Sequence, residues 1–430
     1  MESLDIKNRM SRWIGLIRGI ALGGLIAWAA IQYGGMDPAD SYILFLGLAL
    51  LFLLSFADGI RVEWWGYGLL VPLVPMAFNG SYPYDVLKFA SLWLAAVVGA
   101  HQARRDWEAG RRLSPLILIL IGTGIFEALL GLTQSLGRFA GRDIPFIPMG
   151  TIVNRNHFAG FLEMLVPLVL MVGFARLYDR RIRPNHSGSR IAPRGEYAAR
   201  AWMFLMIGAL LFLAILFSLS RGGTFAAMTG TVVAAVLLWR RLPGCHRLLS
   251  RSLAAGTALV ILAGSLWIGI QPVLERFVQV PASAVDRSSI WRGTNAIIGD
   301  HPFMGVGAGM HGWAFTLYQD RNPDLFYDHA HNDYLEAAAE WGIPAAAVFF
   351  IVITIMIWKA RSACLVAADP TRAAFLAGGV GGVAALLIHS FVDFNLHIPS
   401  GAMLFGVILG MTATIARFRE VEIIHPEEHE

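Results

Sequence analysis

The amino-acid sequence predicts an all-α integral membrane protein, with about 12 transmembrane helices and one large loop that contains short helices. Of its 430 residues, 56% are hydrophobic and 15% are charged, whereas soluble domains carry about 25% charged residues. Long apolar stretches recur along the chain, and basic residues gather in alternate loops. These observations indicate a chain that folds in lipid, and no nucleic-acid-binding motif accompanies its net charge of +4.

The apolar stretches define the expected membrane spans, since a helix that crosses the bilayer needs roughly 20 mainly apolar residues. The expected spans are 13–33, 41–57, 64–78, 85–101, 114–137, 157–178, 198–219, 222–239, 252–271, 334–358, 372–391 and 398–416. The third is short and contains Pro72 and Pro75. The first follows a basic N-terminus and lacks a small-residue cleavage site, so we expect a retained helix instead of a signal peptide.

The loop charges predict the orientation of these helices. The positive-inside rule places basic loops in the cytoplasm, and it is satisfied when both chain termini are cytoplasmic. The basic loops are then Arg104 to Arg112, Arg176 to Arg200, Arg240 to Arg251 and Lys359 to Arg372. Cys245 and Cys364 also fall in predicted cytoplasmic loops, where thiols stay reduced, so no disulfide is expected.

The chain divides into four expected regions. Residues 1–271 hold the first nine helices, 272–333 an extracytoplasmic loop, 334–416 the last three helices, and 417–430 a cytoplasmic tail. The loop is too polar to span a membrane but is rich in aromatic residues, which favour burial. We therefore expect a folded cap on the membrane, with helices near 287–299 and 310–320.

The segment DHAHNDYLEAAAEWG, residues 328–342, carries the strongest local signal. Asp333 followed by Glu336 fits a capping arrangement at the start of a helix, which puts His329 and His331 just before the helix N-terminus. Positive charge at that terminus disfavours imidazolium, so a neutral histidine there can accept a proton as a general base. Alternatively, both histidines hydrogen-bond to the loop, or they bind a metal with Asp328. A His-x-His pair supplies only two ligands, so we expect no metal.

The segment SLSRGG, residues 218–223, is the second signal. It forms the predicted tight turn between two spans, with Arg221 at its centre. An arginine at membrane depth is costly and is usually functional or paired. Gly222 and Gly223 would allow a sharp turn and leave room for a bulky group. A diphosphate would suit this turn, because a guanidinium matches phosphate oxygens.

Residues 286–309 of the loop supply further candidates. Arg287 and Arg292 are expected to bind phosphate or sugar, and Trp291 could stack on a sugar ring. Each arginine alone is equally consistent with a surface contact. The run GVGAG at 305–309 lacks a preceding strand, so we interpret it as a turn and not as a nucleotide-binding loop.

Two weaker clusters share the predicted outer face. In TIVNRNHFAG, residues 151–160, Asn156 is expected to cap a helix, while Arg155 and His157 could line a site. In HSFVDFNLHIP, residues 389–399, Asp393 lies four residues from His389 and from His397. Helical spacing would bring at least one of these histidines near Asp393. Structural pairing is the favoured interpretation, and orientation of a catalytic site is the alternative.

Taken in order, SRGG, the DR-x3-W pattern leading to HPFMGVGAG, and AHNDYLEAAAEWGIP resemble the O-antigen ligase and O-antigen polymerase family of bacterial inner-membrane proteins. The matching stretch covers roughly residues 150–400, and Arg221, Arg287 and His331 fall at the family's functional positions. The resemblance implies about 12 helices, a large periplasmic loop and transfer of a glycan from undecaprenyl diphosphate to an acceptor. It further implies a metal-independent, inverting reaction without a cofactor, in which His331 deprotonates the acceptor hydroxyl and the arginines stabilise the departing diphosphate. His329 and Asn332 of the same motif are expected to contact substrate.

The motifs do not separate the acceptors. The expectation is a ligase that transfers O-antigen to lipid A core, with a polymerase that joins lipid-linked repeat units as the first alternative. A transporter of anionic lipid or sugar is the second alternative. Transporters usually show repeated halves with broken helices at the midplane, whereas the polar residues here gather on one face. That asymmetry favours an enzyme in the bacterial inner membrane whose active site faces the periplasm.

Overall fold

The computed structural model describes residues 2–136, 149–152, 154–182, 194–242, 282–320 and 324–418. Every regular element in these ranges is a helix, and 10 of the described helices are long and apolar enough to cross a membrane. They are α1 (Glu2–Ile31), α2 (Pro38–Ala57), α5 (Pro83–Glu108), α6 (Pro115–Leu136), α7 (Arg155–Ile182), α8 (Arg194–Phe217), α9 (Arg221–Arg241), α15 (Ile343–Val366), α16 (Pro370–His389) and α17 (Pro399–Arg417). The protein is therefore a multi-pass membrane protein, as predicted.

Two of the expected spans do not appear among these 10 helices. Residues 64–78 form two short helices, α3 (Trp64–Leu69) and α4 (Leu73–Met76), and neither can cross a bilayer. Pro72 lies between them, and a proline has no backbone N–H to continue the helical hydrogen bonds. The expected span at 252–271 falls outside the described residues.

The expected span at 334–358 is also divided. Its first part is α14 (Asp333–Trp341), and the spanning helix α15 begins only after Gly342. Gly342 has φ of +79°, and a Cβ there would lie 2.2 Å from the carbonyl oxygen of Phe303. Only glycine fits that conformation and that space, so α14 changes direction and packs with the cap.

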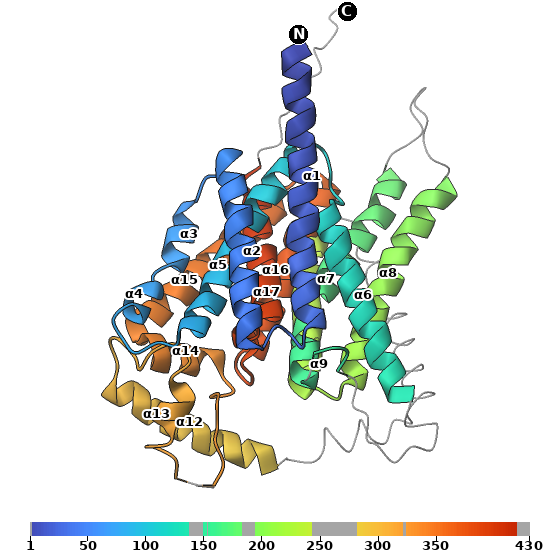
Figure 1. Ribbon diagram of the computed structural model, residues 1–430. Coiled ribbons are helices and arrows are strands. Elements are labelled where there is room, and N and C mark those ends of the chain that lie inside the picture. Colours follow the sequence, from blue (N-terminus) through green and yellow to red (C-terminus); the bar gives the residue numbers. More distant parts are fainter. Residues whose placement is uncertain are drawn as a thin grey trace, which may run out of the picture.

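Helices α16 and α17 lie at the centre of the bundle (Figure 1). The apolar windows of α7 and α17 are 94% and 89% buried, compared with 28% for α2 at the periphery. Small residues allow close helix contacts: a Cβ on Gly410 would lie 2.1 Å from the Ala96 carbonyl oxygen, and one on Gly230 would lie 2.4 Å from that of Gly381. The most buried helices are therefore those that lead toward the polar segments described below.

The cap gathers at one end of the bundle, opposite the start of α1 (Figure 1), and we call this the cap end. It contains α12 (Ala282–Asp300) and α13 (His311–Phe315), which match the helices expected near 287–299 and 310–320, although α13 is shorter. Ile290, Ile297 and Phe315 form a small apolar core with Ala330 and Ala339. The cap is therefore folded, as its aromatic content predicts.

Charged residues gather at the opposite end. Arg18 and Arg105 contact Asp58 at 3.1 Å, and Arg417 contacts Glu63 at 2.5 Å. The concentration of arginines there accords with the predicted cytoplasmic side, and the orientation stays a prediction. Cys364 is buried in the last turn of α15 and not in a loop, contrary to expectation, while Cys245 lies outside the described residues.

Candidate active site

The polar residues at the cap end are brought together by two segments that meet beside α12 and the start of α7. One is the loop 328–332 before α14, and the other is the turn 390–398 between α16 and α17. The N-cap of α14 is Asn332, whose side chain accepts hydrogen bonds from the amides of Tyr334 and Leu335 at 3.0 and 3.1 Å. The expected cap, Asp333, instead accepts a 2.7 Å bond from the Ser390 hydroxyl. Asn and Asp cap equally well, so their adjacency in sequence left the cap undetermined.

His331 adopts a strained backbone conformation at the end of this loop. Its φ is +51°, in the left-handed region that non-glycine residues seldom occupy. Such outliers cost about 1–3 kcal/mol and cluster at functional sites. Nδ1 is buried and lies 3.5 Å from Oδ1 of Asp393, and the side chain is 32% exposed. This geometry leaves Nε2 as the ring nitrogen that can meet a substrate.

Asp393 links three of the candidate residues. Besides its contact with His331, Oδ2 accepts a 2.6 Å hydrogen bond from Nδ2 of Asn156 and lies 4.0 Å from Nη2 of Arg287. The carboxylate is 1% exposed. Burial alone would raise the pKa of Asp393, but the contact with His331 and the charges of nearby histidines hold it below its usual range. An ionised carboxylate therefore faces the imidazole.

The expected pairing of Asp393 with His389 or His397 is wrong. Helix α16 ends at His389, and only a short 3-10 helix, η1 (Asn395–His397), follows. The helical spacing on which the expectation relied is therefore absent. His389 contacts Glu163 at 2.9 Å, and His397 contacts Asp333 at 3.0 Å. Asp393 instead faces other candidate residues, and orientation of a catalytic site, the alternative interpretation, stays a prediction.

The start of α7 contributes two side chains to the same place. Asn156 is not a cap, because the side chain of Asn154 accepts the hydrogen bond from the Asn156 amide at 2.8 Å. Nδ1 of His157 lies 3.1 Å from Oδ1 of Asn395. Arg155 is the first residue of α7, one position before Asn156. The start of α7 thus contacts the Asp393 carboxylate through Asn156.

Phe394 lies among three histidines and was not predicted from the sequence. Its ring stacks on His329 with centroids 4.0 Å apart, and it meets His157 and His331 edge-on at 4.6 and 5.0 Å. The ring is 8% exposed. In the sequence, a phenylalanine next to a candidate aspartate suggests an ordinary buried residue. Only the position of Phe394 between the two segments identifies it as part of the site.

A second polar cluster lies next to His331 and holds its loop in place. Nδ1 of His329 contacts Glu336 at 2.5 Å, and the amide of Ala330 donates to the same carboxylate at 2.8 Å. Nε2 of His397 lies 3.4 Å from Glu336 and 3.8 Å from Glu340. The cluster joins the loop to α14 and to η1.

The charges in this cluster support one another. Burial lowers the pKa of His397, but the charge of Glu336 and the hydrogen bond to Asp333 raise it well above its ordinary value. Burial raises the pKa of Glu336, but the charges of His397 and His329 lower it below its ordinary value. The arrangement is an ion-paired network.

His329, Glu336 and His397 are also residue types that bind zinc, with potential ligand atoms within 4.8 Å of one another. The group differs from the predicted one, because it does not contain Asp328 or His331. Nδ1 of His329 and both ring nitrogens of His397 make the carboxylate contacts described above. The geometry therefore fits an ion-paired support for the loop, and donor type alone would allow a divalent ion.

The three candidates on α12 have different surroundings. Arg287 points toward Asp393, whereas Arg292 pairs with Asp320 at 3.0 Å on the surface and is 58% exposed. Nε1 of Trp291 donates to the carbonyl oxygen of Ala330 at 3.0 Å. Trp291 therefore connects α12 to the loop 328–332, and Arg287 is the α12 arginine that lies near Asp393.

Arg221 occupies the first position of α9, where Ser220 is the N-cap and accepts from the Gly223 amide at 3.2 Å. The turn itself is made by Leu219, with φ of +56°. A Cβ on Gly222 would lie 2.8 Å from Nε2 of His389. The glycines therefore allow neighbouring helices to approach closely, and His389 occupies the space that was predicted for a bulky ligand. The contact with the end of α16 brings the Arg221 turn toward the segment that carries Asp393.

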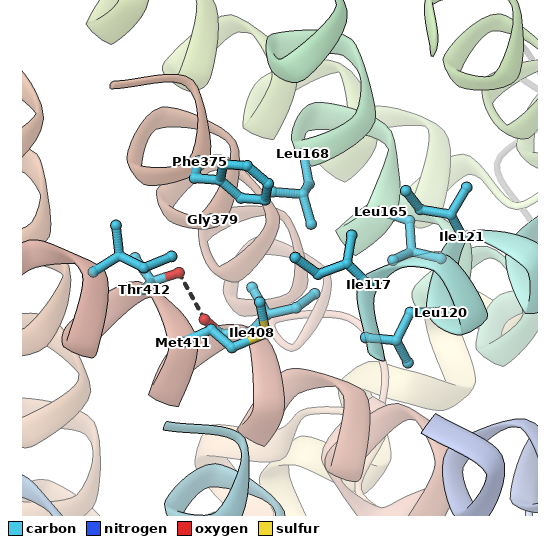
Figure 2. Close-up of a pocket in the computed structure, with 11 residues that line it drawn as sticks. Ile117, Leu120, Ile121, Leu165, Leu168, Phe375, Gly379, Ile408, Met411 and Thr412 are labelled. Carbon is cyan, nitrogen blue, oxygen red and sulfur yellow. Dashed lines mark hydrogen bonds between the residues drawn. The ribbon is translucent and has the colours of Figure 1, made fainter. Parts of the chain in front are cut away.

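A cavity inside the bundle is unrelated to this chemistry. Figure 2 shows its lining by Ile117, Leu165 and Phe375, and by Thr412, whose hydroxyl bonds to the Ile408 carbonyl. Its volume is about 10 Å³, and no titratable side chain lines it. It is a packing gap between spans.

A comparison with protein-family models identifies residues 204–350 as a match to the family described as O-Antigen ligase. The matched region runs from α8 into α15 and contains Arg221, Arg287 and His331. The resemblance stated from the sequence is confirmed over this region. The segments that supply Asn156 and Asp393 lie outside it. No curated protein matches the chain.

Proposed function

We propose that the protein is a membrane glycosyltransferase that moves a glycan from undecaprenyl diphosphate to an acceptor hydroxyl at the periplasmic face. One observation carries the proposal: a strained, partly exposed histidine lies against a buried aspartate that also faces Arg287. The family match supports the broad class, since its members transfer lipid-linked glycans. No cofactor is required for this chemistry.

The proposed reaction is a single displacement with inversion. Nε2 of His331 takes the proton of the acceptor hydroxyl as its oxygen attacks the anomeric carbon. The bond from that carbon to the diphosphate oxygen breaks, and Arg287 and Arg221 stabilise the charge on the departing lipid diphosphate. Asp393 stabilises the imidazolium that forms, as the aspartate does in a Ser-His-Asp triad. The base and the stabilising charges are side chains, so we propose a metal-independent step.

We further propose lipid A core as the acceptor, which makes the enzyme an O-antigen ligase of lipopolysaccharide assembly. The description of the matched family supports this choice. A polymerase would use the same residues with a second lipid-linked glycan as acceptor. Trp291, Arg155, His157, His329 and Asn332 stay candidates for substrate contact, and Arg292 is a peripheral candidate because it pairs with Asp320 on the surface. A transporter is less favoured, because the ionisable residues that meet here lie at one end of the helices.

The test is transfer by the purified protein from an undecaprenyl-diphosphate glycan, with EDTA present and with lipid A core or a second donor molecule offered as acceptor. Wild type, His331→Ala, Arg221→Ala and the surface control Asp300→Asn are compared. Transfer by wild type and the control that is lost in the other two supports the mechanism, and the productive acceptor distinguishes ligase from polymerase. Undiminished transfer by His331→Ala would exclude this histidine as the base.

A further inference from the structure

A buried acid–base pair lies deep in the bundle below the candidate site. Glu163 of α7 and His389 of α16 are 0% and 1% exposed, and Nδ1 of the histidine lies 2.9 and 3.2 Å from the two carboxylate oxygens. Glu163 lies about 12 Å along the helix axis from the first residue of α7. Ionisable residues at such depth are costly and are functional candidates by default, while a buried pair is weak evidence for stability.

The pair packs directly against the turn that carries Arg221. A Cβ on Gly222 would lie 2.8 Å from Nε2 of His389, and one on Gly223 would lie 3.4 Å from Oε2 of Glu163. The first turn of α9 thus rests on both members of the pair. Glycine is required at 222 because any side chain would displace the histidine.

The same histidine begins the segment that reaches the proposed base. Ser390 follows it, and the Asp333 amide donates to the Ser390 carbonyl at 2.9 Å. Val392 also contacts the Arg221 turn, since a Cβ on Gly222 would lie 3.1 Å from its side chain. Asp393, the next residue, faces His331. His389 is therefore placed between the turn that carries Arg221 and the carboxylate that orients the base.

We propose that Glu163 and His389 are positioning residues that fix Arg221 relative to the His331–Asp393 pair. This inference rests on the proposed function, in which Arg221 meets the diphosphate and His331 meets the acceptor. Neither residue of the pair contacts substrate. A displacement of about 1 Å far from the reacting atoms can reduce a rate about 100-fold, so a small shift of the α9 turn is enough to matter.

The test uses Glu163→Gln and His389→Gln in the full-length protein, with Glu127→Gln as the matched control. Glu127 is also a fully buried acid in a span, but its carboxylate accepts a hydrogen bond from the Thr151 amide at 2.8 Å, where Glu163 pairs with a histidine. We expect kcat/KM for the donor to fall about 10- to 100-fold in both variants, with the acceptor KM and the control unchanged. Combining either variant with Arg221→Lys, which keeps the positive charge and with it a measurable rate, should give no further loss beyond Arg221→Lys alone.

A merely structural role predicts a different pattern. The unfolding temperature would drop, kcat/KM per folded molecule would stay within twofold of wild type, and any losses would multiply with that of Arg221→Lys. Either of the last two results overturns the proposal. If one variant does not fold, the other still decides between these patterns. Absence of transfer by wild type would instead contradict the proposed function.

Discussion

Replacing Asp393 by Asn tests the charge that we assign to the proposed base. Oδ1 lies 3.5 Å from Nδ1 of His331, and the carboxylate is buried. At an effective dielectric constant of about 20, unit charges at that separation attract by about 4–5 kcal/mol. The imidazole is 32% exposed, so solvent screening reduces the attraction between Asp393 and protonated His331 to about 2–3 kcal/mol. At about 1.4 kcal/mol for each tenfold in rate, kcat should fall about 30- to 150-fold.

The assay is single-turnover transfer from the lipid-linked donor at saturating acceptor. Asp393→Asn keeps the side-chain shape, so donor KM should change far less than kcat, and Asp300→Asn in the cap should behave like wild type. A loss below threefold in a variant that unfolds at the wild-type temperature would refute the assignment. The buried carboxylate would then serve packing and not proton transfer.

Three other perturbations have defined outcomes. In the folded protein the pKa of His397 is raised well above its ordinary value of 6.5. The stability that protonated His397 contributes to the fold is therefore complete below about pH 6.5 and is lost as pH rises through the folded pKa. The difference in unfolding temperature between wild type and His397→Gln should shrink over that range. Phe394→Leu removes the ring between the histidines and should slow transfer about tenfold; an unchanged rate would reduce this ring to packing. Arg292→Ala should slow transfer less than about fivefold, because its exposed ion pair with Asp320 contributes about 0–1 kcal/mol, whereas Arg287→Ala should abolish measurable transfer; equal losses would contradict the surface assignment of Arg292.

The sequence predicts the membrane helices well, because hydropathy and length are local properties of the chain. The broken span at 64–78 could have been recognised from Pro72, but the division at Gly342 could not. That glycine is required by the Phe303 carbonyl, which lies 2.2 Å from where its Cβ would be. The contact depends on the cap folding back onto the start of α15, and no local pattern encodes it.

The sequence identifies the candidate residues, but it does not predict which of them contact one another. His331 and Arg287 follow from motifs, whereas Asp393 was assigned the wrong neighbours. Helical spacing fails between residues 389 and 397 because the chain leaves the helix at His389. Glu163 gave no signal at all, since one acid within an apolar helix resembles an isolated polar residue. Both errors concern contacts between segments that are far apart in sequence.

The strained conformation of His331 requires support on both sides, and the surrounding contacts supply it. On one side, the backbone amide of Ala330 donates a hydrogen bond to Glu336, and its carbonyl oxygen accepts one from the Trp291 indole. On the other, the Asp333 amide donates to the carbonyl oxygens of the turn at 2.9 and 3.2 Å. Fixing both neighbours leaves the intervening residue little freedom to relax from φ of +51°. The ion-paired network thus has a physical role beside the proposed base: it offsets about 1–3 kcal/mol of backbone strain and keeps Nδ1 directed at Asp393.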